Sequence, residues 1–140
     1  MVELVVVVMI LGIIASIAAP RLLGTSQAAS DNALKQTLSV IRDAIDSYSA
    51  SNESLPGADG NQATFKADIA PYLRGSAFPT CPVGAAKNDA IRMQTGTGSI
   101  ASGVGTSDGT FSWAYKFQSG EFGVNSTALS GDNATTYDQF

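Results

Sequence analysis

The side chains that most often carry out catalysis are scarce in this chain. It contains no histidine and a single cysteine, Cys81, among its 140 residues. Histidine is the commonest general base and transition-metal ligand, and one cysteine can form neither an intramolecular disulfide nor a cysteine-cluster metal site. The sequence also lacks a suggestive pair of carboxylates and a glycine-rich phosphate-binding loop. We therefore predict that the protein is not an enzyme.

Two carboxylates near the C-terminal end could bind a cation. Asp132 and Asp138 offer the oxygen ligands that calcium prefers, but their spacing is not that of an EF-hand loop. Two interpretations stay open, a calcium site or solvated carboxylates in a turn, and the missing spacing favours the second. No other cofactor is expected.

The charge of the chain argues against a nucleic-acid partner. Its net charge is -4, and its eight basic residues are scattered along the sequence. Proteins that bind nucleic-acid phosphates need a clustered basic surface. We expect no nucleic acid among the partners.

The strongest pattern is an apolar segment next to a lone carboxylate. Residues 4–20 carry no charge, and Glu3 stands at their edge. As a helix, residues 4–19 would span about 24 Å, against about 30 Å for a hydrocarbon core, and the flanks up to residue 23 make up the difference. A secretory signal would need basic residues before the apolar run, yet the first basic residue, Arg21, follows it. A buried core helix is the other simple interpretation.

Glu3 allows two interpretations of its own. A carboxylate beside hydrocarbon is costly unless a partner neutralises it, so such a residue is a functional candidate. Alternatively, Glu3 lies among lipid headgroups and is solvated there.

The run VELVVVVMILGIIASIAAP at residues 2–20 resembles the N-terminal signature of type IV pilins and type II secretion pseudopilins. Glu3, Gly12 and Pro20 fall in the order of that signature. The resemblance implies that the apolar helices bundle into a filament core, where Glu3 pairs with the N-terminal amine of a neighbouring subunit. It also implies that residues 13–19 lose helical structure in the filament, for which a simple kink at Pro20 is the alternative.

The same resemblance implies partners, processing and location. A prepilin peptidase would remove a basic leader, the new N-terminus would be methylated, and an assembly machinery would build the helical homopolymer. The subunit would cross the inner membrane once before assembly and then join an extracellular or periplasmic filament. Glu3 lies closer to the first residue than the family glutamate does, so we expect the mature N-terminus to differ from Met1.

After the apolar segment the pattern becomes amphipathic. Apolar residues recur three and four positions apart, as on one helix face: Leu34, Leu38, Ile41, Ile45 and Tyr48. We expect this face to pack on a sheet, an ion pair between Asp31 and Lys35, and a solvated or neighbour-facing surface at Arg42, Asp43 and Asp46. Breaking residues predict that the helix ends near residues 51–53.

The rest of the chain predicts a small β-rich head. Residues 111–125 alternate aromatic and polar residues on both sides of a Ser-Gly turn, which predicts a hairpin, and residues 90–94 predict another strand. We expect Trp113 and Tyr115 to be core residues rather than a sugar-binding platform. Residues 65–73 predict a short helix or turn. Between Pro79 and Pro82, Cys81 is expected to be a small buried apolar residue.

These observations predict an α+β fold, with a long N-terminal helix packed on a small antiparallel sheet. Its parts are a membrane or filament-core half-helix (residues 1–23), an amphipathic half-helix (24–53) and a globular head (54–140). The predicted function is a structural subunit of a type IV pilus-like filament. The major pseudopilin of a type II secretion system and a single-pass, membrane-tethered binding module are the alternatives. Adhesion, motility, DNA uptake, secretion and electron conduction all fit a filament of this class.

Overall fold

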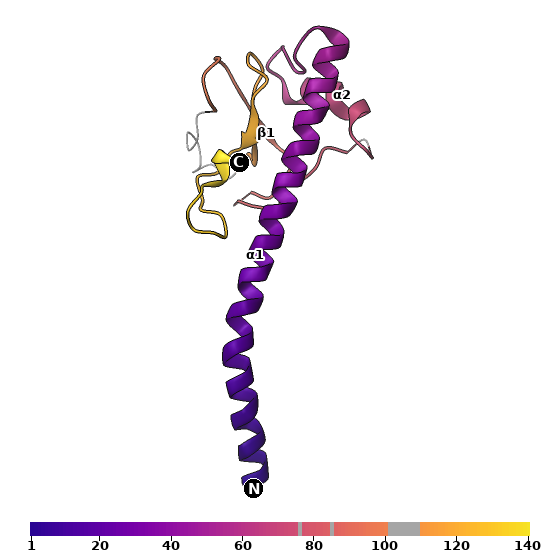
Figure 1. The fold of residues 1–140 in the computed structure, drawn as a ribbon. Coiled ribbons are helices and arrows are strands. Elements are labelled where there is room, and N and C mark those ends of the chain that lie inside the picture. The colour runs from indigo at the N-terminus through magenta and orange to yellow at the C-terminus, as the bar shows by residue number, and fades with distance from the viewer. Residues whose placement is uncertain (76, 85, 101–109) are drawn as a thin grey trace.

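The computed structural model describes residues 1–75, 77–84, 86–100 and 110–140, with the backbone alone described for residues 20–24. One helix, α1 (Val2–Asn52), makes up more than a third of the chain and carries the head on its C-terminal half (Figure 1). It ends where Glu53 adopts a left-handed conformation, with φ of 53°, and its N–H donates to the carbonyl of Ser49. The predicted end near residues 51–53 is therefore confirmed.

The N-terminal half of α1 touches nothing else in the described chain. Its segment Val2–Ala19 has a mean hydropathy of 2.7, and none of it is buried. By length and composition this segment is able to cross a membrane. The helical backbone runs through Pro20 without interruption (Figure 1), so the loss of helix at residues 13–19 stays a prediction for the assembled state.

The C-terminal half of α1 packs against the head through the predicted stripe. Leu34, Leu38, Ile41 and Ile45 are all buried, and Tyr48 is half-buried against the ring of Tyr72. Because these residues recur every three or four positions, they form one face along the helix axis. This face supplies the helical side of the core, as the spacing predicted.

The head contains a three-stranded mixed sheet in the order β1-β2-β3, from β1 (Ile91–Gln94), β2 (Trp113–Lys116) and β3 (Phe122–Val124). The hairpin of β2 and β3 is confirmed, and Gly120 provides the positive φ of 77° in its turn. The expectation of a wholly antiparallel sheet is wrong, because β1 pairs with β2 in parallel. The connection through residues 95–112 exceeds the dozen or so residues that a parallel crossover needs.

The aromatic residues of the sheet form the centre of the core. Trp113 and Tyr115 are fully buried, which contradicts the sugar-platform alternative. Phe65, from α2 (Gln62–Ile69), lies with its ring centroid 4.3 Å from that of Tyr115, and the Trp113 and Phe122 centroids are 5.3 Å apart. These four rings join α2 to the sheet.

The second face of β2 is buried as well, although the residues on it are small or polar. Ala114 and Lys116 are both buried there. The Lys116 ammonium donates hydrogen bonds to the carbonyls of Gly98 and Ser99, at 2.5 and 2.6 Å. A buried cation needs such partners. The loop after β1 therefore covers this face.

Two shorter features complete the head. The predicted helix or turn at residues 65–73 is α2 followed by the 3₁₀ helix η1 (Ala70–Tyr72), and a second 3₁₀ helix, η2 (Tyr137–Gln139), lies near the C-terminal end. Cys81 is buried, as expected, and desolvation raises the pKa of its thiol to about 11. A thiol with that pKa is almost wholly protonated at neutral pH and therefore a poor nucleophile.

Candidate assembly site

The apolar surface of α1 is the largest uncovered feature of the described residues. Every residue from 1 to 19 is exposed, among them large side chains such as Ile10, Ile14 and Ile17. Soluble monomers rarely expose an apolar patch of this length. The described residues therefore leave this surface without a cover.

At Gly12 this apolar surface has no side chain. Apart from its chain neighbours and the backbone of its own helical turns, a Cβ atom added there would meet no described atom within 4 Å, so no packing against another described residue requires glycine at this position. Small residues on membrane helices allow a second helix to approach closely.

Glu3 lies in the first turn of α1, and its side chain is exposed. The partial positive charge at a helix N-terminus favours an acidic residue there. Within the described part of the chain, no cation lies close enough to form an ion pair with its carboxylate. Glu3 and Gly12 stand on the same uncovered helix, while for Pro20 the structure gives the helical backbone only.

Two polar side chains of α1, Asp31 and Arg42, attach the C-terminal segment of the head to the helix. Asp31 is buried, and its carboxylate accepts hydrogen bonds from the Tyr137 hydroxyl at 2.9 Å and the Gly131 N–H at 2.8 Å. The expected Asp31–Lys35 ion pair is wrong, because Asp31 is turned toward these donors and Lys35 lies over the Phe140 ring, 4.5 Å from its centroid. Burial, followed by the bond to Asp31, raises the pKa of Tyr137 to about 12.

Arg42 makes the second attachment. Its guanidinium donates to the carbonyl of Phe122 at 3.0 and 3.2 Å and to the Phe140 carbonyl at 2.6 Å. From its position off the apolar stripe, Arg42 was expected to be solvated or to face a neighbour. Its side chain is exposed, as expected, and its hydrogen bonds also join the helix to β3 and to Phe140.

Replacing Tyr137 with phenylalanine tests this attachment. The change removes one donor from a buried carboxylate, and a hydrogen bond to a charged group contributes about 1.5 to 3 kcal/mol. We expect the free energy of unfolding to fall by that amount in a urea titration followed by Trp113 fluorescence. Asp43→Asn, at an exposed position of the same helix, should change it by less than about 0.5 kcal/mol. Equal stability of Tyr137→Phe and the parent chain would show that Asp31 does not hold the segment.

The two carboxylates considered as calcium ligands have other surroundings. Asp132 accepts hydrogen bonds from the Ser130 hydroxyl and from the N–H groups of Ala134 and Thr135, and these bonds hold the pKa of its carboxyl well below the usual range. Asp138 lies on η2. Among the residues that the structure describes, no group of three or more acidic, cysteine or histidine side chains is placed to hold a metal ion. Asp132 acts as the stabilising residue of a turn.

No family model, no curated protein and no solved structure matches this chain.

Proposed function

We propose that this chain is a structural subunit of a type IV pilus-like extracellular filament and that it assembles through α1. The observation that carries the proposal is the uncovered apolar half of a continuous helix whose other half bears a folded head. Before assembly, lipid covers the apolar half in a single pass across the inner membrane. In the filament the same surface is covered by the helices of neighbouring subunits, so it never has to face water.

Three residues of the apolar half have a place in this arrangement. Gly12 is the point where neighbouring helices approach closely, and Pro20 removes one helical hydrogen bond, which allows the backbone to open during packing. Glu3 pairs with the N-terminal amine of a neighbouring subunit. Because an unpaired buried charge is costly, this pair favours one axial register over others.

The head has the role of an outer layer around the core of helices. Its fully buried aromatic rings and fixed attachment to α1 support a rigid, pilin-like head rather than one built around a ligand. A pseudopilus of a secretion system would use the same architecture. A membrane-tethered binding module would need the apolar anchor but would give Glu3 and Gly12 no purpose.

The proposal is tested by the behaviour of the full chain and of a shortened chain. We expect the full chain to need detergent or to be recovered in filaments visible by electron microscopy, because no described residue of the head covers residues 2–19. A chain that begins at Thr25 should be a soluble monomer in gel filtration with light scattering. A full chain that is soluble and monomeric without detergent would remove the basis of the proposal.

A further inference from the structure

Outside the apolar half of α1, few large apolar side chains are exposed on the described part of the head and helix. They are Val40, Tyr72 and Leu129, with 52%, 38% and 53% of their surface exposed. Isolated apolar residues on a surface are ordinary. Here, however, Val40 and Tyr72 line one groove, and Leu129 lies on a loop elsewhere.

The groove lies between α1 and the segment that follows α2, and has a volume of about 430 Å³. Its apolar lining includes Val40, Ala44, Tyr72, Leu73 and Pro79. On α1 the groove is lined by Val40, Asp43, Ala44 and Ser47. These residues are three, one and three positions apart, so they belong to one helix face. This face differs from the one that contacts the sheet.

One cation stands at this groove. Arg74 is among its lining residues and is exposed, and in the part of the chain that the structure describes no acidic side chain forms an ion pair with it. The groove therefore combines an apolar surface with one positive charge, at Arg74, and one exposed carboxylate, Asp43, on its helical wall.

Leu129 lies on a loop that carries one apolar and one charged side chain. The loop is closed by a bridge between Leu129 and Thr136 and by a hydrogen bond of 2.9 Å from the Ser130 N–H to the Thr135 carbonyl. Asp132, three positions after Leu129, keeps an exposed negative charge while its hydrogen bonds hold the turn. The loop thus presents one apolar side chain and one carboxylate from a fixed backbone, which lowers the entropic cost of binding.

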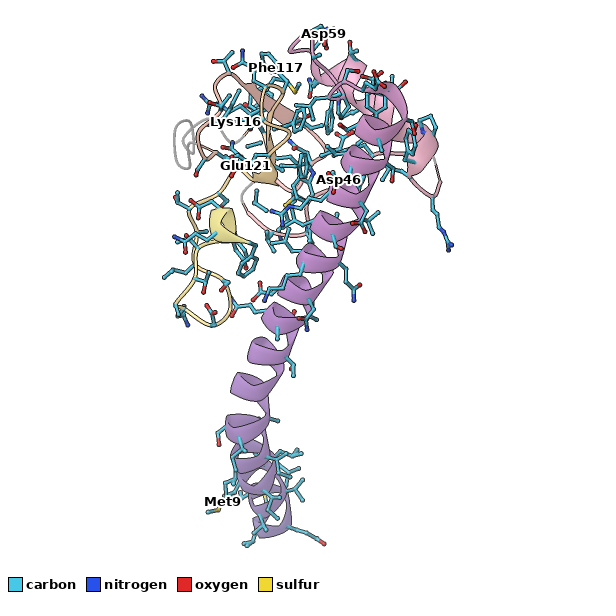
Figure 2. All side chains as sticks on the ribbon, turned by 45° about the horizontal axis from the view of Figure 1, so that its top comes forward. Met9, Asp46, Asp59, Lys116, Phe117 and Glu121 are labelled. Atoms are coloured by element: carbon cyan, nitrogen blue, oxygen red, sulfur yellow. The ribbon has the colours of Figure 1, made fainter. Side chains whose placement is uncertain are left out.

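The loop and the groove lie on opposite sides of α1. In Figures 1 and 2 the yellow C-terminal segment lies on one side of the helix and the pink segment after α2 on the other. One copy therefore cannot fill its own groove with its own loop. Contacts between two different surfaces of identical subunits can repeat without closing and so produce open helical assemblies.

We infer that this groove binds the Leu129 loop of a second copy of the chain, with Leu129 against Val40 and Tyr72 and the charge of Asp132 facing Arg74. The inference rests on the proposed filament function and names a contact between heads that does not use the apolar helix. Apolar surface provides the affinity of such a contact, and the charge pair fixes its orientation.

Cysteine cross-linking of the full chain tests the contact. Val40→Cys and Leu129→Cys are combined in one chain, and membranes and filaments from cells that make only this chain are treated with copper phenanthroline. Because each copy offers both surfaces, we expect a ladder of dimers, trimers and longer covalent species on a non-reducing gel. The native Cys81 is buried with a raised pKa, so the parent chain should give only the monomer band on the same gel.

Three controls define the result. Each single-cysteine variant should give no more cross-linking than the parent. A chain with Leu129→Cys and Ser119→Cys, the latter at an exposed position in the turn between β2 and β3, should not give a ladder. Adding Arg74→Glu to the Val40–Leu129 pair should lower the yield of trimers and longer species by about threefold to tenfold, while Arg74→Lys should keep it.

The outcomes separate this contact from the filament proposal. Filaments without a ladder would overturn the contact and leave the filament function in place, whereas a ladder without filaments would support the contact and count against the filament. Dimers from a single-cysteine variant would overturn the contact, because they require two copies of one surface to meet. A ladder from the Ser119 control would also overturn it, and an unchanged yield with Arg74→Glu would overturn the role given to the charge pair.

Discussion

Replacing Glu3 with alanine should abolish filaments while leaving expression, membrane insertion and folding of the head unchanged. In the proposed filament core, the variant leaves the N-terminal amine of a neighbour without its counter-charge in a low-dielectric site. Breaking a buried ion pair by removing one partner costs about 3 to 5 kcal/mol. That cost recurs at every subunit contact, so a growing filament should fail early. The measurement is filament yield by electron microscopy in cells that lack the parent chain.

Glu121→Ala is the matched control for this experiment. Glu121 is an exposed glutamate at the β2–β3 hairpin (Figure 2), far along the chain from the apolar helix. The same change of side chain there should leave filament yield at the parent level. In a plain membrane anchor Glu3→Ala would be neutral or would improve membrane retention, because a carboxylate near hydrocarbon is unfavourable. Parent-level filament yield from Glu3→Ala would thus remove the role assigned to Glu3.

Replacing Trp113 with alanine should lower the free energy of unfolding of the chain that begins at Thr25 by about 3 to 5 kcal/mol. The side chain is fully buried, its ring packs on Phe122, and its indole N–H donates to the Pro79 carbonyl at 3.2 Å. The variant loses the buried apolar surface, leaves a cavity and removes the partner of that carbonyl. A small domain has about 5 to 15 kcal/mol of stability in total, so the loss should be large in a urea titration followed by circular dichroism.

Trp113→Phe separates the ring from the hydrogen bond. It keeps an aromatic ring in the core but cannot donate to Pro79, so it should lose less stability than the alanine variant. An effect of Trp113→Ala below about 1 kcal/mol would contradict the packing described for the core, since truncation of a buried tryptophan to alanine costs about 3 to 5 kcal/mol.

The features that could be predicted from the sequence are those formed by residues that lie close together in it. The stripe that includes Leu34 and Leu38 follows from helical periodicity alone, and the hairpin follows from alternation on both sides of a Ser-Gly turn. Each pattern lies within one or two elements. Physical rules about a single helix or hairpin are therefore sufficient to find them.

Contacts between distant parts of the chain could not be found in this way. Asp31 bonds to a tyrosine 106 positions away, and Arg42 bonds to carbonyls 80 and 98 positions away. From local spacing Asp31 was paired with Lys35, because an i, i+4 ion pair is the nearest available partner. The direction of β1 was missed for a similar reason, since it depends on the path of the crossover rather than on the strand itself.

The same limit applies to the candidate site. Glu3 was identified as a lone carboxylate at the edge of an apolar run, and Gly12 through the resemblance of residues 2–20 to a known N-terminal signature. Both signals lie in the sequence itself and need no structure. The groove beside Val40 was not predicted, because its two walls come from α1 and from the segment after α2. Nothing in the local sequence of either wall indicates that the other lies beside it.

The unbroken course of α1 has a mechanical consequence. A tensile load applied between the N-terminal end and residue 52 passes along one helix, while the head is attached to the side of that helix through Asp31, Arg42 and the apolar stripe. The strands of the sheet are therefore not in series with the load. Pulling would stretch the helical hydrogen bonds of α1 before it unzipped the sheet, and the weakest link would be the turn in which Pro20 supplies no N–H. Extension under force should thus begin next to the apolar half and leave the head folded.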